Sequence, residues 1–530
     1  MLSKNAIKNA DRIILSDSFT FDYVIENNCL YVDKTTYLYK LVSSPKKLYF
    51  FSRPRRFGKS LTLSTLKAIF QGKKELFKDL FIYDQPYEWK SYPIIHLDMG
   101  SNNAHSPEKL EKFLLDSIKD VASEYDITLT REYASDAFIE LIKKLYKRNG
   151  SVVVLIDEYD KPILGNLENE NIESLQRLMK GFYGVIKTCE PYERFAFITG
   201  VGKFFKVSIF SELNNLNDIS MSKDYATMCG YTEKELEENF HGRLADLATK
   251  NGFEYEEFRQ EIKKWYDGYR FYDDSETVYN PVSLALFIEG YGKFSNYWFT
   301  TGNPSVVLKL LKDYDFDVES AISEEQFEDI FTAFMPTEVD LIPLMYQTGY
   351  LTIKETIKYG VRTVYKLGFP NLEVTETFYR RLLNYINSKN KGGEKLAMTL
   401  CTSVENGNID KMMSAIDSYL ADVPYDLHIE QEKYYQTIFY IIFKFIGTNV
   451  TTEYRTSDGR IDAVIETQAD VYIFEFKLNQ SSEIALEQIM QKEYYKAHEH
   501  KGKKITLIGA NFDFKTKRLS EWKKLQVVNQ

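Results

Sequence analysis

The segment Ser52–Ser60, SRPRRFGKS, ends in the residue types that a phosphate-binding loop requires. Such a loop turns its backbone N–H groups inward, uses a lysine to reach the β and γ phosphates, and places a hydroxyl for Mg²⁺ at a helix start. The run Leu48–Phe51 predicts the preceding strand and Leu61–Phe70 the following helix. We therefore expect ATP to contact Ser52, Arg53, Pro54, Arg55, Arg56, Phe57, Gly58, Lys59, Ser60 and Leu61.

Arg53 departs from the GxxxxGKS pattern, which has glycine at this position, and Pro54 follows it. The loop is therefore stiffer and more basic than usual. An arginine-rich surface turn is the alternative interpretation, and the flanking strand and helix favour the phosphate loop. Several cations could act as an arginine finger or its lysine equivalent, and the sequence does not select among Arg53, Arg55, Arg56 and Lys203.

The apolar run Val152–Ile156 delivers Asp157 and Glu158 at the carboxyl end of a predicted strand. We expect Asp157 to hold Mg²⁺ through water or Ser60, and Glu158 to polarise the attacking water as general base. A buried strand that merely ends in two solvated acids is the alternative. Thr199, at the end of the next strand, could contact the γ phosphate or the water, although threonine is common in strands.

A second group of charged residues lies near the C-terminus, in GRID and FEFK. Metal-dependent phosphodiester cleavage uses two carboxylates on one Mg²⁺ and a lysine that orients water. Glu475 and Lys477 are two apart on one predicted strand and so share a face, and Asp462 would approach from the adjacent strand of a hairpin. An ion pair on a solvated sheet edge is the alternative. Glu432 and Gln488, on the helices before and after the hairpin, could complete the cluster.

Composition narrows the class of protein. The 530 residues predict several domains, and 44% apolar residues supply each with a core. We see no signal peptide and no bilayer-length apolar run, and we expect a cytoplasmic protein without membrane contact. The four cysteines lack zinc spacing. His498 and His500 are interpreted as surface histidines. The net charge of −10 neither demands nor excludes nucleic acid, and the basic tail after residue 500 is interpreted equally well as a phosphate track or a solvated face.

The order of elements predicts an α/β multidomain protein with four parts. Strands at Leu48–Phe51, Ile94–Asp98, Val152–Ile156 and Phe195–Thr199, with helices between them, predict a P-loop NTPase parallel sheet. We expect this domain at 1–225, a helical lid at 226–330 that starts at a capping box on Thr232, a small winged-helix-like unit at 331–400, and a restriction-endonuclease-like α/β domain at 401–530.

With these residues in view, the chain resembles a bacterial family that joins an AAA-ATPase-like domain to a C-terminal PD-(D/E)XK nuclease-superfamily domain. The resemblance rests on YVDKT, SRPRRFGKS, LIDEYDKPI, FSELNNL, WYDGY, YNP, GRID and FEFK, and it spans nearly the whole chain. It implies that Arg53 is normal for the family's loop. It also implies that Asp462, Glu475 and Lys477 match the nuclease core, with Ile461 in place of the proline of the superfamily's name.

These observations lead to two hypotheses. In the first, an ATPase controls a Mg²⁺-dependent nuclease that acts on DNA. In the second, the chain is a nucleotide-controlled binding switch whose nuclease-like domain recognises a partner without cutting it. The nucleic-acid target and any self-association into a homo-oligomer stay open.

Overall fold

The computed structural model describes residues 12–203, 215–298, 305–311, 318–331, 340–386, 392–423, 432–445, 449–456, 459–467, 469–500 and 502–527. The chain divides into two compact units, which are Met1–Thr300 with Ile322–Asn371, and Thr301–Ala321 with Leu372–Gln530. Within the described ranges, no helix is both long and apolar enough to cross a membrane.

The first unit is built on a five-stranded sheet with the order β2-β3-β4-β1-β5, in which all neighbours are parallel. Its central strands are continuous apolar runs because helices cover both faces. The carboxyl ends of parallel strands meet at one edge, so the ends of β1, β3 and β4 lie together there. The strands are β1 (Leu48–Ser52), β2 (Ile94–Asp98), β3 (Val152–Asp157), β4 (Glu193–Gly200) and β5 (Asn217–Asp218).

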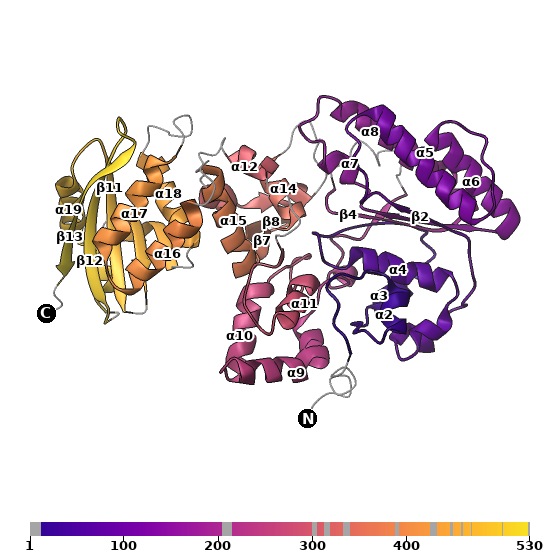
Figure 1. Ribbon diagram of the computed structural model, residues 1–530, viewed down its shortest axis with the longest axis horizontal. Coiled ribbons are helices and arrows are strands. Elements are labelled where there is room, and N and C mark those ends of the chain that lie inside the picture. The colour runs from indigo at the N-terminus through magenta and orange to yellow at the C-terminus, as the bar shows by residue number, and fades with distance from the viewer. Residues whose placement is uncertain are drawn as a thin grey trace. The chain divides into compact units, whose positions relative to one another are not determined.

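The helices of this unit lie on the two sides of the sheet, with α5, α6 and α8 on one side and α2, α3 and α4 on the other (Figure 1). Ser106 caps α5 with its side chain, and Pro107 occupies the first turn, where a missing N–H costs little. The helices are α2 (Phe21–Glu26), α3 (Thr35–Ser43), α4 (Lys59–Phe70), α5 (Pro107–Glu124), α6 (Ala134–Asn149), α7 (Lys161–Leu164) and α8 (Ile172–Thr188), with 3-10 turns η1 (Lys74–Phe77), η2 (Phe81–Asp84), η3 (Glu190–Tyr192) and η4 (Lys223–Tyr225).

A helical part follows the sheet. The predicted capping box is confirmed, since the Thr232 hydroxyl accepts from Glu235 N and the Glu235 carboxylate accepts from Thr232 N. Phe240, Phe258 and Phe287 join the helices in one apolar cluster. The elements are α9 (Glu233–Lys250), α10 (Tyr255–Tyr266) and α11 (Pro281–Glu289).

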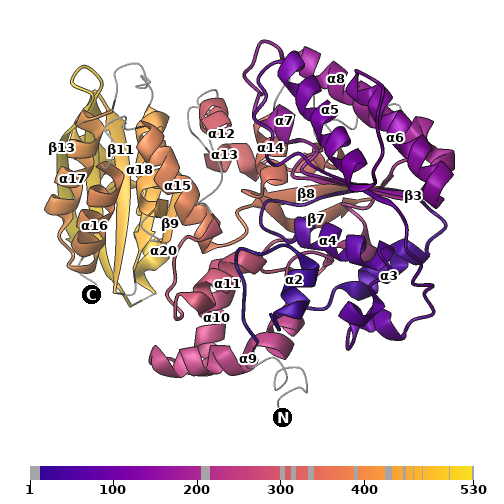
Figure 2. The same ribbon diagram turned by 45° about the vertical axis from the view of Figure 1, so that its right-hand side comes forward.

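A small antiparallel sheet of order β6-β8-β7 completes the first unit, with α14 next to it in sequence (Figure 2). The boundary between the units falls after Asn371, inside the segment 331–400 that we expected to form one winged-helix-like part. Here α15 therefore belongs to the second unit. The elements are β6 (Gln326–Phe327), η7 (Glu328–Phe331), α14 (Leu341–Thr348), β7 (Thr352–Tyr359), β8 (Arg362–Gly368) and α15 (Leu372–Ile386).

The second unit has a five-stranded mixed sheet of order β13-β12-β11-β10-β9. Strands β9, β10 and β11 form an antiparallel meander, and β12 returns parallel to β11 after α19. The elements are α12 (Ser305–Leu310), α16 (Gly392–Glu405), α17 (Ile409–Ala421), α18 (Glu432–Phe445), β9 (Asn449–Thr456), β10 (Gly459–Glu466), β11 (Asp470–Leu478), α19 (Ser482–Gln491), α20 (Lys496–Glu499), β12 (Lys504–Asp513) and β13 (Arg518–Val527), and the division between the units falls inside α13 (Val318–Ser323).

The α/β class, with a parallel sheet first and a mixed sheet last, is confirmed. Strand β13 was not predicted, because it contains many charged residues and few apolar ones, so its sequence lacks a clear apolar alternation. His498 is 1% exposed, so its interpretation as a surface histidine is wrong, whereas His500 is exposed.

Candidate functional site

The phosphate-loop candidate connects β1 to α4 at the carboxyl edge of the parallel sheet. Two residues turn its backbone into the left-handed region, Arg56 with φ 66° and Gly58 with φ 95°. Gly58 is the N-cap of α4, and Lys59 begins the helix. Successive N–H groups in such a turn at a helix start form a concave site for anions.

Lys59 lies inside this turn and is 6% exposed. Its ammonium donates to the carbonyl oxygens of Arg53 and Pro54, at 3.0 Å each. Burial lowers the pKa of Lys59, and the carboxylates of Asp157, Glu158 and Asp160 oppose that shift. Lys59 is therefore a buried cation near three acids, and in this structure its hydrogen-bond acceptors are carbonyl oxygens of its own loop.

Ser60 and Asp157 meet as the sequence predicted. Burial raises the pKa of Asp157, and its hydrogen bond with the Ser60 hydroxyl counteracts the rise. Asp157 is 5% exposed and its Oδ1 also accepts from Glu158 N at 2.9 Å. A hydroxyl and a carboxylate side by side are the oxygen ligands that suit Mg²⁺, so these residues fit the ion.

Sequence reasoning missed a third acid at this edge, Asp98. It ends β2 directly beside Asp157 in the parallel register. A Cβ built on Gly100 would lie 2.9 Å from Asp98 Oδ1 and 3.1 Å from Glu158 Oε2, so these two carboxylates flank the same glycine. The signal was present, because both strands were predicted and parallel neighbours end at the same edge.

A second missed acid, Asp160, follows β3 and forms hydrogen bonds with the backbone that follows β4. Its carboxylate accepts from Val201 N at 3.0 Å and Gly202 N at 2.7 Å. Burial raises the pKa of Asp160 to about 6, and these hydrogen bonds limit the rise. Thr199, just before this turn, is fully buried, and among the described residues its hydroxyl has no hydrogen-bond partner.

Arg53 has a different position from the one expected of a nucleotide contact. Its guanidinium lies between the rings of Phe51 and Phe271, at 4.3 and 4.1 Å from their centroids. The side chain is 2% exposed, and burial lowers its pKa to about 10. It donates to the carbonyl oxygens of Ser52, Ser220, Tyr225 and Ala226. The arginine therefore anchors the loop to the chain that follows β5.

The other loop residues also pack inward. Phe57 lies edge-on to Tyr269, with centroids 4.7 Å apart, and Pro54 contacts Gly349. Arg56 Nη1 donates to the Tyr297 carbonyl at 2.7 Å. Of the other finger candidates, Lys203 forms an ion pair with Asp218, Arg55 is half-buried, and Leu61 is half-buried on α4.

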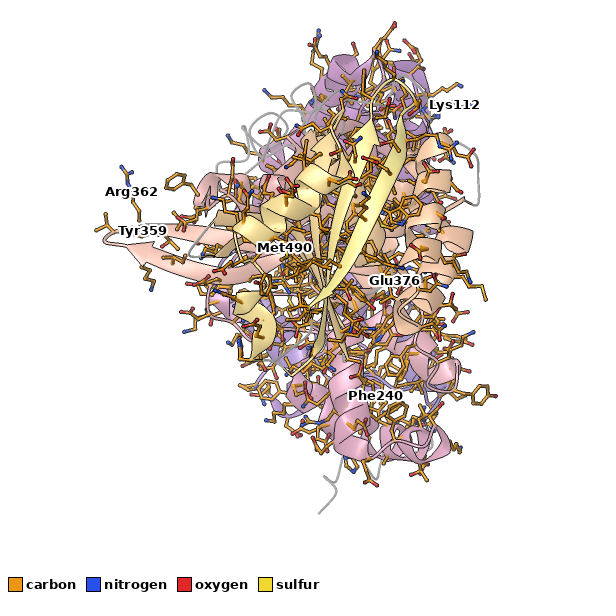
Figure 3. All side chains as sticks on the ribbon, turned by 90° about the vertical axis from the view of Figure 1, so that its left-hand side faces the viewer. Lys112, Phe240, Tyr359, Arg362, Glu376 and Met490 are labelled. Atoms are coloured by element: carbon orange, nitrogen blue, oxygen red, sulfur yellow. The ribbon has the colours of Figure 1, made fainter. Side chains whose placement is uncertain are left out.

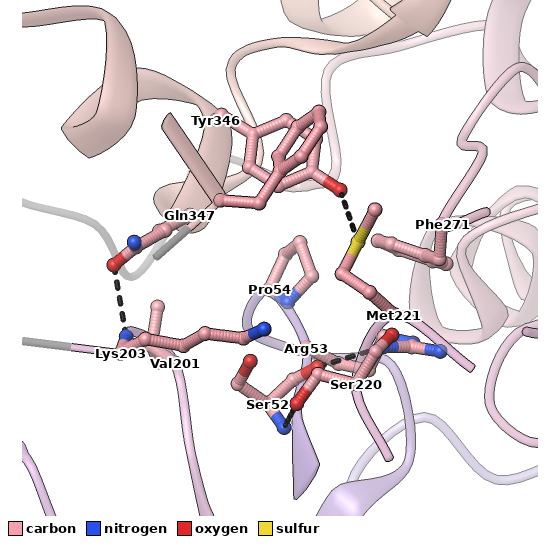
Figure 4. Close-up of a pocket in the computed structure, with 11 residues that line it drawn as sticks. Ser52, Arg53, Pro54, Val201, Lys203, Ser220, Met221, Phe271, Tyr346 and Gln347 are labelled. Carbon is pink, nitrogen blue, oxygen red and sulfur yellow. Dashed lines mark hydrogen bonds between the residues drawn. The ribbon is translucent and has the colours of Figure 1, made fainter. Parts of the chain in front are cut away.

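A pocket of about 320 Å³, its open mouth included, adjoins the loop (Figure 4). Ser52 N donates to the Ser220 hydroxyl at its floor, and Lys203 N donates to Gln347 Oε1 at 2.9 Å. The Tyr346 hydroxyl donates to Met221 Sδ. The pocket thus brings β1, the end of β4 and α14 together beside the loop.

The C-terminal charged cluster lies on β10, β11 and α19. Ala463 pairs with Phe474, so Asp462 and Glu475 are opposite each other one step further along the two strands. Asp462 Oδ2 accepts from Phe476 N at 2.7 Å. Glu475, 2% exposed, accepts from the Lys477 ammonium at 3.0 Å.

Gln488 of α19 also donates to Glu475 Oε1, as the sequence suggested. Phe474 and Phe476 point to the opposite face, where both contact Phe439 of α18. Glu432 begins α18, but its side chain lies outside the described residues. Two carboxylates on one face fit a divalent cation. Within the described residues, no group of three acidic, histidine or cysteine side chains forms a metal cluster.

The basic tail is largely paired with acids. Lys524 contacts Asp410, Arg518 contacts Asp417 and Lys503 contacts Glu466. Lys523 contacts Glu483 of α19. This arrangement favours the solvated, ion-paired face over a continuous phosphate track. The motif FSELNNL lies mostly outside the described residues.

Comparison with known proteins gives two family matches. Residues 18–210 match the model described as "Predicted AAA-ATPase", and residues 430–522 match the "PD-(D/E)XK nuclease superfamily". The chain is similar to the "Uncharacterized protein in vnfD 5'region" of Azotobacter chroococcum mcd 1, with 33% identity over 492 residues that cover 91% of this chain and 92% of the relative.

Two solved structures of Aeropyrum pernix proteins show a weak likeness. One is the ORC1 protein in complex with DNA, with a TM-score of 0.27, 9% identity, and coverage of 65% of this chain and 91% of that one. The other is the ORC2 protein in ADPNP-ADP complexes, with a TM-score of 0.26, 11% identity, and coverage of 69% and 94%.

Proposed function

The chain belongs to a family that joins a predicted AAA-ATPase domain to a C-terminal PD-(D/E)XK nuclease-superfamily domain, and on this premise we propose that it binds and hydrolyses ATP to control a Mg²⁺-dependent nuclease acting on DNA. The observation that carries the proposal is the convergence of Lys59, Ser60 and Asp157 at the start of α4. The free cysteines fit a reducing cytoplasmic location.

In the nucleotide site, the N–H groups of the loop bind the phosphates and the Lys59 ammonium turns from the two loop carbonyls to the β and γ phosphates. Ser60 and Asp157 hold Mg²⁺, which neutralises charge on the phosphates when bound. Glu158 accepts a proton from the attacking water, and the Asp98 carboxylate lies near it beside Gly100. Asp160 holds the turn after Thr199, which lies near the carboxyl end of β4.

The ATPase half is tested by calorimetric ATP binding and phosphate release. We expect Lys59→Ala to weaken ATP binding about 100-fold, since it removes a charge-assisted contact to the phosphates. Glu158→Gln should keep binding and lose most turnover. Lys67→Ala, on the same helix, is the matched control and should leave both unchanged. Normal phosphate release by Glu158→Gln would contradict the assignment of the general base.

In the nuclease site, Asp462 and Glu475 hold Mg²⁺, which polarises the phosphodiester when bound. The Lys477 ammonium then orients the attacking water, and Gln488 keeps the Glu475 carboxylate in place. We expect linear and plasmid DNA to be cleaved in Mg²⁺, with at least about 100-fold loss in Asp462→Ala and Lys477→Ala. Lys496→Ala, an exposed lysine of the same unit, is the control. Cleavage that persists in both site variants would refute this assignment.

One observation favours the second candidate, a nucleotide-controlled switch that binds without cutting. Lys477 and Gln488 both donate to Oε1 of Glu475, and a cation that binds this oxygen has to displace part of this arrangement. Calorimetry with Mg²⁺ separates the two candidates. Divalent binding that disappears in Asp462→Asn supports the nuclease, whereas ATP binding without any Asp462-dependent divalent binding supports the switch.

A further inference from the structure

The hairpin of β7 and β8 ends in an exposed tip that the proposed sites do not use. Tyr359 pairs with Arg362, which leaves Gly360 and Val361 as a two-residue turn. Gly360 has φ 64° while Val361 does not have a positive φ, as in a type II′ turn. The Tyr359 side chain is 57% exposed and Val361 is fully exposed. Tyr359 and Arg362 project at the free end of the hairpin (Figure 3).

Two cations flank this apolar tip from opposite sides. Directly opposed residues share a face and adjacent pairs alternate, so Arg362, paired with Tyr359, lies on one face, and Lys358, paired with Thr363, lies on the other. Both cations are exposed, and the described residues offer neither of them an ion pair. One acid lies beside the tip, Glu325, which accepts from the Tyr359 hydroxyl at 3.3 Å.

The next charged pair down the hairpin is already neutralised. Lys366 and Glu355 face each other across the strands at 3.0 Å. Nearer the base, the Lys354 ammonium donates to the Pro370 carbonyl at 2.9 Å, so the two cations of the tip leave positive charge without an ion pair from the described residues on both of its faces. A duplex groove presents phosphates on its two walls and base edges between them, and proteins that enter it place cations on the walls and an apolar wedge at the centre.

The base of the hairpin is joined to the phosphate loop inside the same unit. The Thr352 hydroxyl accepts from Arg270 N at 2.7 Å, and the neighbouring rings of Tyr269 and Phe271 pack on Phe57 of the loop. Gly349, three residues before β7, contacts Pro54. The segment that carries the tip thus contacts the loop directly at Pro54 and is linked to Phe57 indirectly, through residues 269–271.

We propose that the β7–β8 tip docks into a groove of duplex DNA, with Lys358 and Arg362 on the phosphates of opposite walls and Val361 between them. The proposal rests on the proposed nuclease function, because it supplies the surface that holds the substrate. It gives the first unit a role in DNA binding that is separate from cleavage in the second.

The test uses the full chain and a fluorescent 30-bp duplex without divalent cations, with anisotropy measured over a salt series. We expect Lys358→Ala/Arg362→Ala to weaken binding at least about 10-fold and to reduce the slope of log Kd against log salt by about 2. Val361→Ser should weaken binding without changing the slope, and Glu325→Gln should tighten it. Lys112→Ala/Lys119→Ala, two exposed lysines of α5, is the matched control.

The outcomes separate this inference from the nuclease. Binding and slope unchanged by the tip double variant, an equal loss in the α5 control, or a wild type that binds no duplex would overturn the docking surface. Tip-dependent binding by a protein that cuts no DNA would support the docking surface and contradict the proposed nuclease function. Normal cleavage and normal binding by the tip variant would be consistent with the nuclease function and would contradict the docking surface.

Discussion

Arg53 stands where a phosphate-binding loop ordinarily has glycine, and its guanidinium is buried among carbonyl oxygens and two rings. We predict that Arg53→Gly, although it restores the general pattern, destabilises the first unit by at least about 3 kcal/mol, because several buried carbonyls lose a charged donor. Arg53→Lys should not rescue it, since an ammonium lacks the planar fork. Thermal unfolding measures the change. A glycine variant as stable as the wild type would contradict the anchoring role.

Glu193 starts β4 as a buried carboxyl, 4% exposed, and burial raises its pKa to about 8, with help from Glu190. The raised pKa means that the folded state holds this proton over a range where the unfolded chain has lost it. The stability that the folded unit gains by holding the proton on Glu193 is thus present below about pH 4.5 and is lost as the pH rises to about 8. We predict that Glu193→Gln stabilises the unit by on the order of 3 kcal/mol at pH 7 and by little at pH 4.

Hydrogen exchange of β4 amides at several pH values checks this prediction. Glu132→Gln, an exposed glutamate of the same unit, is the control. A Gln variant whose advantage does not grow with pH would mean that Glu193 keeps an ordinary pKa.

At the scale of single residues, the sequence predicted pairs in which one residue ends or lies on a predicted strand and the other lies on or just before a predicted helix. Ser60 beside Asp157, and Gln488 beside Glu475, are examples. It did not predict the distant partners of Arg53, because these carbonyls belong to residues 220–226, whose irregular backbone has no periodicity. The same holds for Asp160, whose partners are N–H groups of a turn.

At the scale of elements, the link between α14 and the phosphate loop is open to a direct test. Gly349 has φ 89°, and an added Cβ would lie 2.7 Å from Pro54 Cβ. We predict that Gly349→Ala lowers ATP affinity several-fold although Gly349 lies outside the loop, because the new methyl group pushes Pro54. Calorimetric ATP titration measures the change.

The hairpin supplies the matched control for this test. Gly360 also has a positive φ, 64°, but nothing lies within 4 Å of its added Cβ. Gly360→Ala therefore carries a similar backbone penalty without touching the loop, and ATP affinity should be unchanged. Equal effects of the two alanines on ATP binding would show that backbone strain, and not contact with Pro54, is responsible.

Element prediction succeeded where periodicity was strong. The helix Pro107–Glu124 was predicted with the bounds that the structure gives, and four strands of the parallel sheet, β1 to β4, were found within a few residues. It failed for β13, whose exposed face is mostly charged, and for the two-residue β5, which is too short to show alternation. The division after Asn371 falls inside the segment 331–400, and periodicity does not show it, because which unit a helix joins depends on long-range packing.

At the scale of the whole molecule, two units with separate sheets and separate apolar clusters are expected to unfold in two transitions. We predict that ATP at 100 times its Kd raises only the first unit's transition, by about 2.7 kcal/mol of added stability, and that Mg²⁺ alone raises only the second. Scanning calorimetry of the full chain, with Lys59→Ala and Asp462→Asn as controls, measures both. A single transition shifted by either ligand would mean that the units unfold together.

The hydrogen bonds from the Lys59 ammonium to the carbonyls of Arg53 and Pro54 also have a kinetic consequence. The loop uses two of the three donors of this ammonium, so we expect it to give up at least one of them before Lys59 can contact both the β and the γ phosphate. The apparent affinity is then reduced by the fraction of molecules in which the lysine is free. In stopped-flow mixing, the observed binding rate should level off at high ATP concentration at the rate of this release. The inverse of that plateau rate is the mean time for which the loop keeps its hydrogen bonds to Lys59.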